Sequence, residues 1–113
     1  MSKNKYAGRY NEKLYREIFD AIFKVKGNTF KVNHLARITG YSGNKLARYM
    51  PNLIEAGCID IVHYRIHYYN NRTKIQRERT RYRKLITPDD IEDKLAEMAR
   101  IQEEKDRGVY YGR

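Results

Sequence analysis

Four arginines at alternating positions offer the clearest chemistry in the sequence. They are Arg77, Arg79, Arg81 and Arg83. Their neighbours include Ile75, Thr80 and Tyr82, which favour a β-strand, and residues two apart in a strand point to the same face. The four guanidinium groups would then form one basic stripe, which binds phosphates by releasing counterions and does so without choosing a base sequence. This pattern indicates a polyanionic partner.

A run of carboxylates follows the arginines. It holds Asp89, Asp90, Glu92 and Asp93. Because Thr87 and Pro88 precede it, the carboxylates fit the first turn of a helix, where they stabilise the positive end of the helix dipole. This capping role explains them better than a metal site does. An alternative is that some of the arginines pair with these carboxylates and hold the helix against the sheet.

The histidines and the single cysteine do not indicate a metal or catalytic site. His63 and His67 would share one strand face, but four strand residues span ~13 Å, whereas zinc–nitrogen bonds are about 2.0 to 2.1 Å. Cys58 cannot form an intrachain disulfide and, directly after Gly57, fits a small core position. The sequence has no glycine-rich phosphate loop and no serine or cysteine in a nucleophile setting. We therefore expect no metal, no cofactor and no enzymatic activity.

The composition limits the class of protein. The chain has 113 residues, with 24 lysines and arginines against 14 aspartates and glutamates, and a formal charge of +10. Its 41% of apolar residues and 11 tyrosines suffice for one modest core and argue against a wholly disordered basic tail. No run approaches the ~20 apolar residues of a membrane span, and no apolar secretory segment follows the first residues. We expect a folded, single-domain, cytoplasmic protein.

The charge is distributed unevenly along the chain. Residues 1–59 carry +7 and residues 60–86 carry +6, whereas residues 87–107 carry −4. Ordinary solvated faces would also give charged runs, but a uniform basic tail would not change sign in this way. We interpret the two basic segments as a binding surface and the acidic segment as a part kept away from it.

The first part of the chain predicts an arm, a helix and a brief strand. Residues 1–10 show no periodicity and are expected to form a flexible basic arm. Apolar residues then recur at three- and four-residue steps, which predicts a helix over 12–26 with Asn11 as its N-cap. The alternating residues 29–32 predict a short strand.

Two further helices and a tight turn follow. Asn33 is expected to cap a helix over 34–39, and Gly40 to end it. Ser42 is then expected to cap a third helix that runs on to Gly57. Two helices joined by a short turn containing glycine form a helix-turn-helix.

The third helix has an inner and an outer face. Its apolar residues Leu46, Met50 and Leu53 are expected to face the first helix. Its polar residues are then expected to face outward: Asn44, Lys45, Arg48 and Asn52. Pro51 removes a backbone donor, so the helix either kinks there or ends near Tyr49; its N-terminal part is preserved in both cases.

The segments 59–69 and 73–85 predict a long β-hairpin, because their period changes to two. A turn at Asn70-Asn71 would make the residue numbers of facing partners add to 141. The resulting pairs are Ile66 with Ile75, His63 with Glu78, Asp60 with Arg81, and Ile59 with Tyr82. An 11-residue strand spans about 36 Å, so part of the hairpin should project from a small domain.

The last segment predicts a helix of about 20 residues that starts at Thr87 and ends at Gly108. It carries an apolar stripe of Ile91, Leu95 and Met98. We divide the chain into an arm (1–10), a main unit (11–86) and an acidic helix with a short tail (87–113).

This order of elements resembles the winged helix-turn-helix family. The family commonly shows Leu-Ala in the second helix, glycine plus an apolar residue in the turn, serine at the next cap, and Leu-x-x-Ala-Gly with two apolar residues before the wing. The matching segments are Leu35-Ala36, Gly40-Tyr41, Ser42 and Leu53 through Ile59. The resemblance covers about residues 11–86 and implies an α+β fold: three helices plus a long two-stranded wing, here followed by a C-terminal helix. Pro51 and the long, basic wing depart from the family pattern.

The resemblance implies sequence-specific binding of double-stranded DNA, as in a transcriptional regulator. Recognition helix 42–50 would enter the major groove, with Asn44, Lys45 and Arg48 as base readers. The wing, 59–85, would lie on the backbone or in a minor groove. The expected backbone contacts are Tyr41, Ser42, Tyr49, Arg72, Thr73, Lys74, Arg77 and Arg79, and the wing tip also includes Asn70 and Asn71.

Three alternatives remain open at this point. Related regulators often form homodimers through a helix after the wing, and Ile91, Leu95 and Met98 fit that role; the same stripe could instead pack on Leu14 and Ile18 of its own chain. A non-specific architectural or RNA-binding protein, such as a ribosome-associated one, would use the same scaffold and arginines. A protein-interaction module would use the acidic helix as its docking face.

Overall fold

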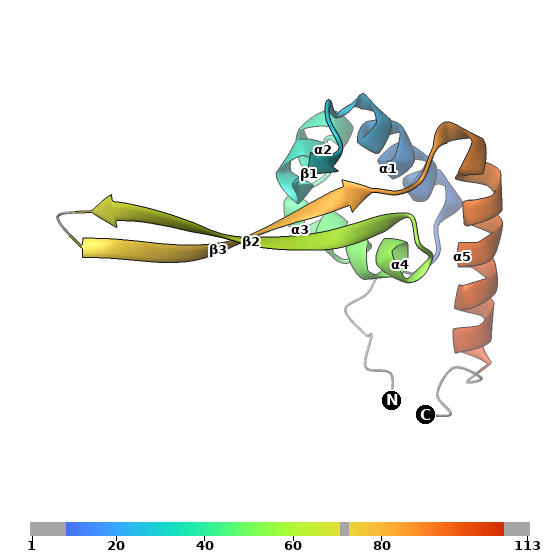
Figure 1. The fold of residues 1–113 in the computed structure, drawn as a ribbon. Helices are drawn as coiled ribbons and strands as arrows, with labels where there is room; N and C mark the ends of the chain where they lie inside the picture. Colours follow the sequence, from blue (N-terminus) through green and yellow to red (C-terminus); the bar gives the residue numbers. More distant parts are fainter. Residues whose placement is uncertain (1–8, 71–72, 108–113) are drawn as a thin grey trace.

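The computed structural model of the chain describes residues 9–70 and 73–107, and the side chains of residues 9–63 and 79–107. It shows a small α+β domain in which helices pack on a three-stranded antiparallel sheet, with the strand order β1-β3-β2 (Figure 1). The predicted arm falls mostly on residues 1–8, which lie outside the described residues. Arg9 and Tyr10 are described and contact the C-terminal helix: Arg9 pairs with Asp106, and the Tyr10 amide donates to Gln102 Oε1 at 3.1 Å.

The first helix, α1 (Glu12–Lys24), supplies one wall of the core. Asn11 caps it as predicted, since its side chain accepts a hydrogen bond from the Leu14 amide at 3.1 Å. The helix ends two residues earlier than predicted. Val25 already has an extended backbone, and Gly27 then takes a φ of +83°, which a helix cannot accommodate.

The second helix, α2 (Val32–Thr39), follows the two-residue strand β1 (Thr29–Phe30). Asn33 was predicted to cap it, but the N-cap is Lys31. His34 determines this boundary, because its Nδ1 accepts the hydrogen bond of the Lys31 amide at 3.1 Å. Gly40 ends the helix as predicted, in the left-handed conformation at φ +85°.

The predicted third helix is two helices, α3 (Gly43–Ala47) and α4 (Met50–Glu55). Pro51 cannot donate to the Ala47 carbonyl, and it lies instead in the first turn of α4, where no such bond is needed. At the junction the Arg48 and Tyr49 amides bond to residues three positions back, as in a 3₁₀ turn. The recognition helix expected over 42–50 is therefore only five residues of α-helix, and the turn follows it.

The two strands of the hairpin alternate their faces as predicted, but their pairing register differs from the predicted one. Strands β2 (Ile59–Asn70) and β3 (Thr73–Lys84) pair antiparallel, with Ile59 opposite Lys84 and Asn70 opposite Thr73. Asn70 is thus a strand residue rather than part of the turn, and Asn71 and Arg72 lie outside the described residues. The four predicted pairs are wrong by two residues: Ile66 faces Arg77, His63 faces Thr80, Asp60 faces Arg83, and Ile59 faces Lys84.

The physical reason is that a shift of two residues leaves every side chain on the same face. Alternation in the sequence therefore cannot distinguish the two registers, whereas tertiary contacts can. Phe30 in β1 faces Tyr82, and their rings lie 5.7 Å apart. At the base of the hairpin, the Leu85 and Ile86 amides both donate to the Cys58 carbonyl, which sets where the strands end.

The C-terminal segment starts as predicted. Thr87 precedes the short 3₁₀ turn η1 (Pro88–Asp90), and its amide and hydroxyl both donate hydrogen bonds to the Asp90 carboxylate; α5 (Ile91–Asp106) continues from this turn. Gly108, the predicted end, lies outside the described residues. Leu95 and Met98 are only 3% and 4% exposed and join the core of the same chain. The apolar stripe is thus used within the molecule, and the alternative of packing on its own chain is the one observed.

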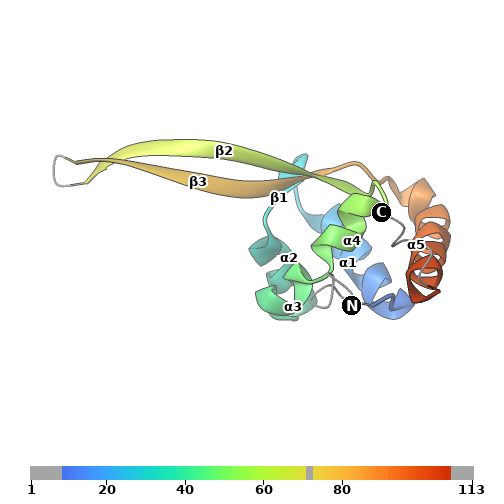
Figure 2. The ribbon, with the colours of Figure 1, turned by 90° about the horizontal axis from the view of Figure 1, so that it is seen from below.

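The hairpin and α5 lie at opposite ends of the molecule. Figures 1 and 2 show the outer part of β2 and β3 projecting from the helical body, with α5 on the far side and α2 and α3 between them. The projection was predicted, and it explains extents of 55 × 33 × 22 Å. Because Leu95, Met98 and Ile101 share one core with α1, α5 is packed as part of the body rather than apart from it.

Candidate nucleic-acid interface

Helix α3 presents the three predicted base readers to solvent. Asn44, Lys45 and Arg48 are all exposed, while Leu46 between them is fully buried and fixes the rotation of the helix. Asn52 does not belong to this face, contrary to the prediction. It is half-buried in α4, and its Nδ2 donates to the Tyr15 hydroxyl at 2.9 Å.

The turn before α3 is tied to α1 and supports Lys45. The Tyr41 hydroxyl donates to Glu17 of α1, and this bond stabilises the protonated phenol and raises the pKa of Tyr41. The Lys45 ammonium lies over the Tyr41 ring, 4.4 Å from its centroid. The Ser42 hydroxyl accepts the Lys45 amide at 3.1 Å. Tyr41 thus acts as a support in this structure, since its hydroxyl is already committed.

Tyr49, a predicted backbone contact, is half-buried at the α3–α4 junction. Its ring meets the Tyr15 ring edge-on at 5.6 Å. Burial raises the pKa of Tyr15 to about 12, so this hydroxyl stays protonated. The Tyr49 ring and the bond from Asn52 to Tyr15 attach the junction to α1, which holds α3 in place from behind.

The outer face of the sheet carries the arginine stripe, because Phe30 and Tyr82 place the other face toward the core. Arg79 is exposed. Arg81 is half-buried, and its guanidinium donates to Thr29 of β1, to Oγ1 at 3.0 Å and to the carbonyl at 3.4 Å. Arg83 lies 3.6 Å from the Asp60 carboxylate. The side chains of Thr73, Lys74 and Arg77, and all of Asn71 and Arg72, lie outside the described part, so those predicted contacts remain predictions.

The acidic helix does not pair with the arginine stripe among the described side chains. Glu92 instead forms two hydrogen bonds with Arg16 of α1, at 2.8 and 3.0 Å, which hold the pKa of Glu92 below its usual value. Asp90 is engaged in capping. Of the described arginines, Arg81 is bonded to Thr29 and Arg83 is paired with Asp60 rather than with residues 89–93, so the alternative role is not observed for them.

A second basic cluster surrounds His34, and the sequence analysis missed it. Burial lowers the pKa of His34, and three neighbouring cations add to the effect: Arg81, Arg37 and Lys31. A surface groove beside it is lined by Val25, Lys26, His34, Arg37 and Ile38. The sequence signal that could have revealed this cluster is the presence of three cations and one histidine between residues 26 and 37. Their convergence depends on how β1 turns into α2, which spacing alone does not reveal.

Ion pairing divides the cations of the described side chains into two groups. Those on α5 and at its C-cap, and the two that reach it from the N-terminal part of the chain, have carboxylate partners: Arg9, Arg16, Lys94, Arg100, Lys105 and Arg107. Those around α2, α3 and the sheet mostly have none among these side chains: Lys26, Lys31, Arg37, Lys45, Arg48, Arg79 and Arg81. Lys84 of β3 also has no carboxylate partner there, and its ammonium donates to the Val25 carbonyl.

There are exceptions to this division. Arg83 and Lys24, near the second group, are paired, and Lys13 of α1 is unpaired among the described side chains. The unneutralised positive charge is thus concentrated away from α5.

The remaining chemical candidates have structural roles. Cys58 is fully buried, and burial raises its thiol pKa to about 12. His63 contacts Thr80 across the strands at 3.3 Å. In the described part of the chain, no three His, Cys, Asp or Glu side chains are grouped so that they could hold a metal ion. The helices of that part also include none with the length and apolar character to span a membrane.

Comparison of the chain with protein-family models, with curated proteins and with solved structures found no match.

Proposed function

We propose that this protein binds double-stranded DNA in a sequence-specific manner, as a transcriptional regulator of the winged helix-turn-helix type. The observation that carries the proposal is the set of cations around α2, α3 and the base of the sheet that have no carboxylate partner among the described side chains, with Lys24 and Arg83 as paired exceptions. Such cations are available to replace the counterions of a nucleic acid, whereas paired ones are not. The order of helices, short strand and long hairpin supports the winged-helix assignment.

Specificity is proposed to reside in the exposed face of α3. Arg48 can bond guanine, and Asn44 can bond adenine, each through two hydrogen bonds in the major groove. Five helical residues rise only roughly 8 Å, so the helix would enter the groove by its first turn rather than lie along it. Lys45, held over Tyr41, would contact a phosphate or a base at the edge of that turn.

The hairpin is proposed to add affinity without sequence choice. The exposed Arg79 and its neighbours on the outer face would follow the phosphate backbone, where each cation adds to the salt dependence of binding. These two roles resemble those in the winged-helix family, in which a helix contacts the bases and a wing contacts the DNA backbone.

Selection of bound sequences from a random DNA pool tests the proposal. We expect a short enriched motif, because α3 offers two side chains suited to particular bases. Arg107→Ala is a matched control: Arg107 is an exposed arginine at the C-cap of α5, paired with Glu103, so the variant should select the same motif. Recovery of DNA without any motif would contradict specific readout, and no salt-dependent binding would contradict the proposal as a whole.

A second candidate is non-specific binding to duplex DNA or structured RNA, and the arginine face of the hairpin favours it. A labelled duplex competed by random DNA and by structured RNA separates the two functions. Competition in proportion to phosphate content would support this second candidate.

A further inference from the structure

We propose that the cluster formed by Lys26, Lys31, His34, Arg37 and Arg81, here called the His34 surface, binds phosphates of the DNA backbone beside the segment that α3 contacts. The inference rests on the proposed function and extends the contact area beyond α3 and the hairpin. It assigns a phosphate-binding role to α2 and to the turn between α1 and β1.

The geometry of the His34 surface is fixed by hydrogen bonds within the fold. Arg81 is held to Thr29 by two hydrogen bonds, and His34 is held by the Lys31 amide. Because His34 Nδ1 accepts that amide, the neutral ring carries its proton on Nε2 and remains a donor there. The groove that Lys26, His34 and Arg37 line is thus bordered by donors and contains no carboxylate among its lining residues.

The charges of this surface are not neutralised by the described side chains. Lys26, Lys31, Arg37 and Arg81 have no carboxylate partner there, and Lys24, two residues from Lys26, is paired with Asp20 at 3.1 Å. Holding several cations together without a counter-charge costs electrostatic free energy, and an anion that lies between them would relieve it. The lowered pKa of His34 reflects the same crowding of positive charge.

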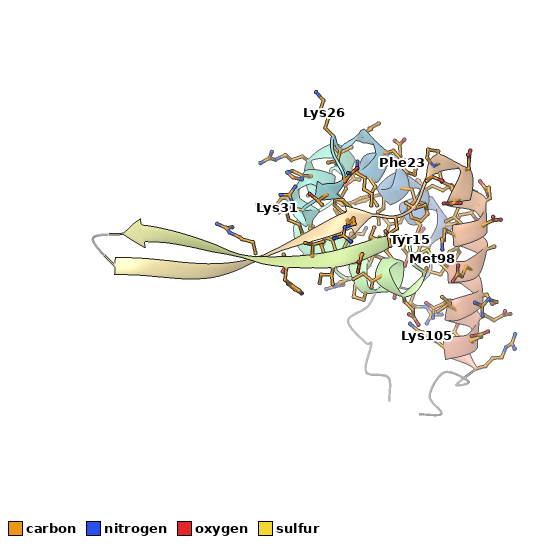
Figure 3. The ribbon with its side chains drawn as sticks, viewed as in Figure 1. Tyr15, Phe23, Lys26, Lys31, Met98 and Lys105 are labelled. Carbon is orange, nitrogen blue, oxygen red and sulfur yellow. The ribbon has the colours of Figure 1, made fainter. Side chains whose placement is uncertain are left out.

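The position of the surface fits a flanking contact. Figure 3 shows Lys31 near the base of the hairpin and Lys26 at the outer end of the turn after α1. Figures 1 and 2 place α2 beside α3 and on the side of the body from which the hairpin projects. A DNA duplex bound by α3 and the hairpin would therefore also run along the His34 surface. The phosphates of its backbone would be the anions that this surface contacts.

The test measures binding of the full chain to a series of duplexes. Each duplex contains the DNA motif selected from the random pool and extends it outward by a few more base pairs. If the random pool yields no motif, duplexes of mixed sequence and increasing length take its place. We expect affinity and salt slope to rise once the duplex reaches the His34 surface. In the variant Lys26→Ala/Arg37→Ala this gain should disappear, with the slope lower by about one unit per residue. Lys24→Ala is the matched control, because its charge is already balanced by Asp20.

The outcomes separate this inference from the proposed function. A wild-type protein that binds the short duplex but gains nothing from longer ones overturns the inference alone. So does a Lys26→Ala/Arg37→Ala variant that keeps the full gain while its circular dichroism matches the wild type. A wild-type protein that binds no duplex of any length contradicts the proposed function itself.

Discussion

At the scale of single residues, the candidate interface depends on side chains that are held in place before any ligand arrives. Leu46 fixes the rotation of α3, and the Tyr41 ring supports Lys45. Tyr41 is itself bonded to Glu17 of α1. Restrained side chains lose less conformational freedom on binding, which favours affinity.

Arg48→Ala should relax sequence preference. Arg48 is exposed, and no described carboxylate pairs with it, so its guanidinium is available to a guanine edge. We expect a loss of about 1 to 3 kcal/mol on the selected motif and a much smaller loss on random DNA. Competition binding on both DNAs measures the difference. Equal losses on every sequence would show that Arg48 contacts the backbone instead.

Substitutions of Tyr41 should distinguish the contribution of its ring to DNA affinity from the contribution of its hydroxyl. Tyr41→Leu removes the support under Lys45, and we expect DNA affinity to fall by about two- to fivefold, the range of an exposed cation–π contact. Tyr41→Phe keeps the ring and should retain most of the affinity. Titration of a labelled duplex measures both. Each substitution is also made in a Lys45→Met background. There, Tyr41→Leu should no longer lower DNA affinity, because the lysine that the ring supports is absent.

At the scale of elements, the helix boundaries are set by individual capping groups. Pro51 divides α3 from α4, and His34 sets the start of α2. The C-terminal helix is fastened to the body at both of its ends: Lys94 donates to the Ala56 carbonyl at 2.8 Å, and Lys105 pairs with Glu55 at 2.9 Å. These contacts link α5 to the end of α4 and so to the segment that carries α3.

The cap of α2 should make stability depend on pH. The folded protein lowers the pKa of His34 below its usual value of about 6.5, so folding favours the neutral ring. The free energy of unfolding should therefore fall as pH decreases from 7.5 to 5.5, because protonation breaks the bond from the Lys31 amide and adds charge beside Arg37 and Arg81. Urea unfolding at both pH values measures the loss. His34→Asn keeps an acceptor but does not titrate, and a loss of equal size in that variant would contradict the prediction.

Truncation of the α5 stripe should destabilise the whole fold. Leu95 is 3% exposed in the shared core, so Leu95→Ala should cost about 2 to 5 kcal/mol of unfolding free energy. Urea unfolding measures it. Glu103→Ala, at an exposed position of the same helix, is the control and should change stability by less than about 1 kcal/mol. Equal effects from the two substitutions would show that α5 packs only loosely.

At the scale of the whole molecule, charge and shape are polarised together. Among the described side chains, positive charge without carboxylate partners gathers around α2, α3 and the base of the sheet, while the cations of α5 are paired. The hairpin extends away from α5, so the acidic segment lies far from the proposed DNA contacts (Figure 1). This arrangement keeps repulsion between carboxylates and phosphates low.

The burial of the α5 apolar stripe argues against a dimer through that stripe. Because Leu95, Met98 and Ile101 are buried in one chain, a dimer through this stripe would require α5 to leave the core. We expect light scattering to give the mass of a single chain over a wide concentration range. A stable dimer that dissociates in the Leu95→Ala variant would restore the dimer interpretation.

The sequence by itself determined the order of helices and strands and most of their faces, although it did not separate α3 from α4 or place Asn52. Asn11, Gly40 and Ser42 act as the caps that their types predict, and Thr87 lies at its predicted N-cap position, since capping depends on local hydrogen bonds. Alternation placed the arginines on one face, because that property depends only on the period of a strand.

The tertiary structure decided between arrangements that the local sequence pattern fits equally well. A two-residue shift preserves alternation, so only the contacts of Phe30 with Tyr82 and of Cys58 with Ile86 select the register. The apolar stripe of α5 fits an intermolecular or an intramolecular partner equally well, and the space left beside α1 settles the choice. The cluster around His34 is complete only when β1, β3 and α2 meet, because Arg81 of β3 then joins the cations of residues 26–37.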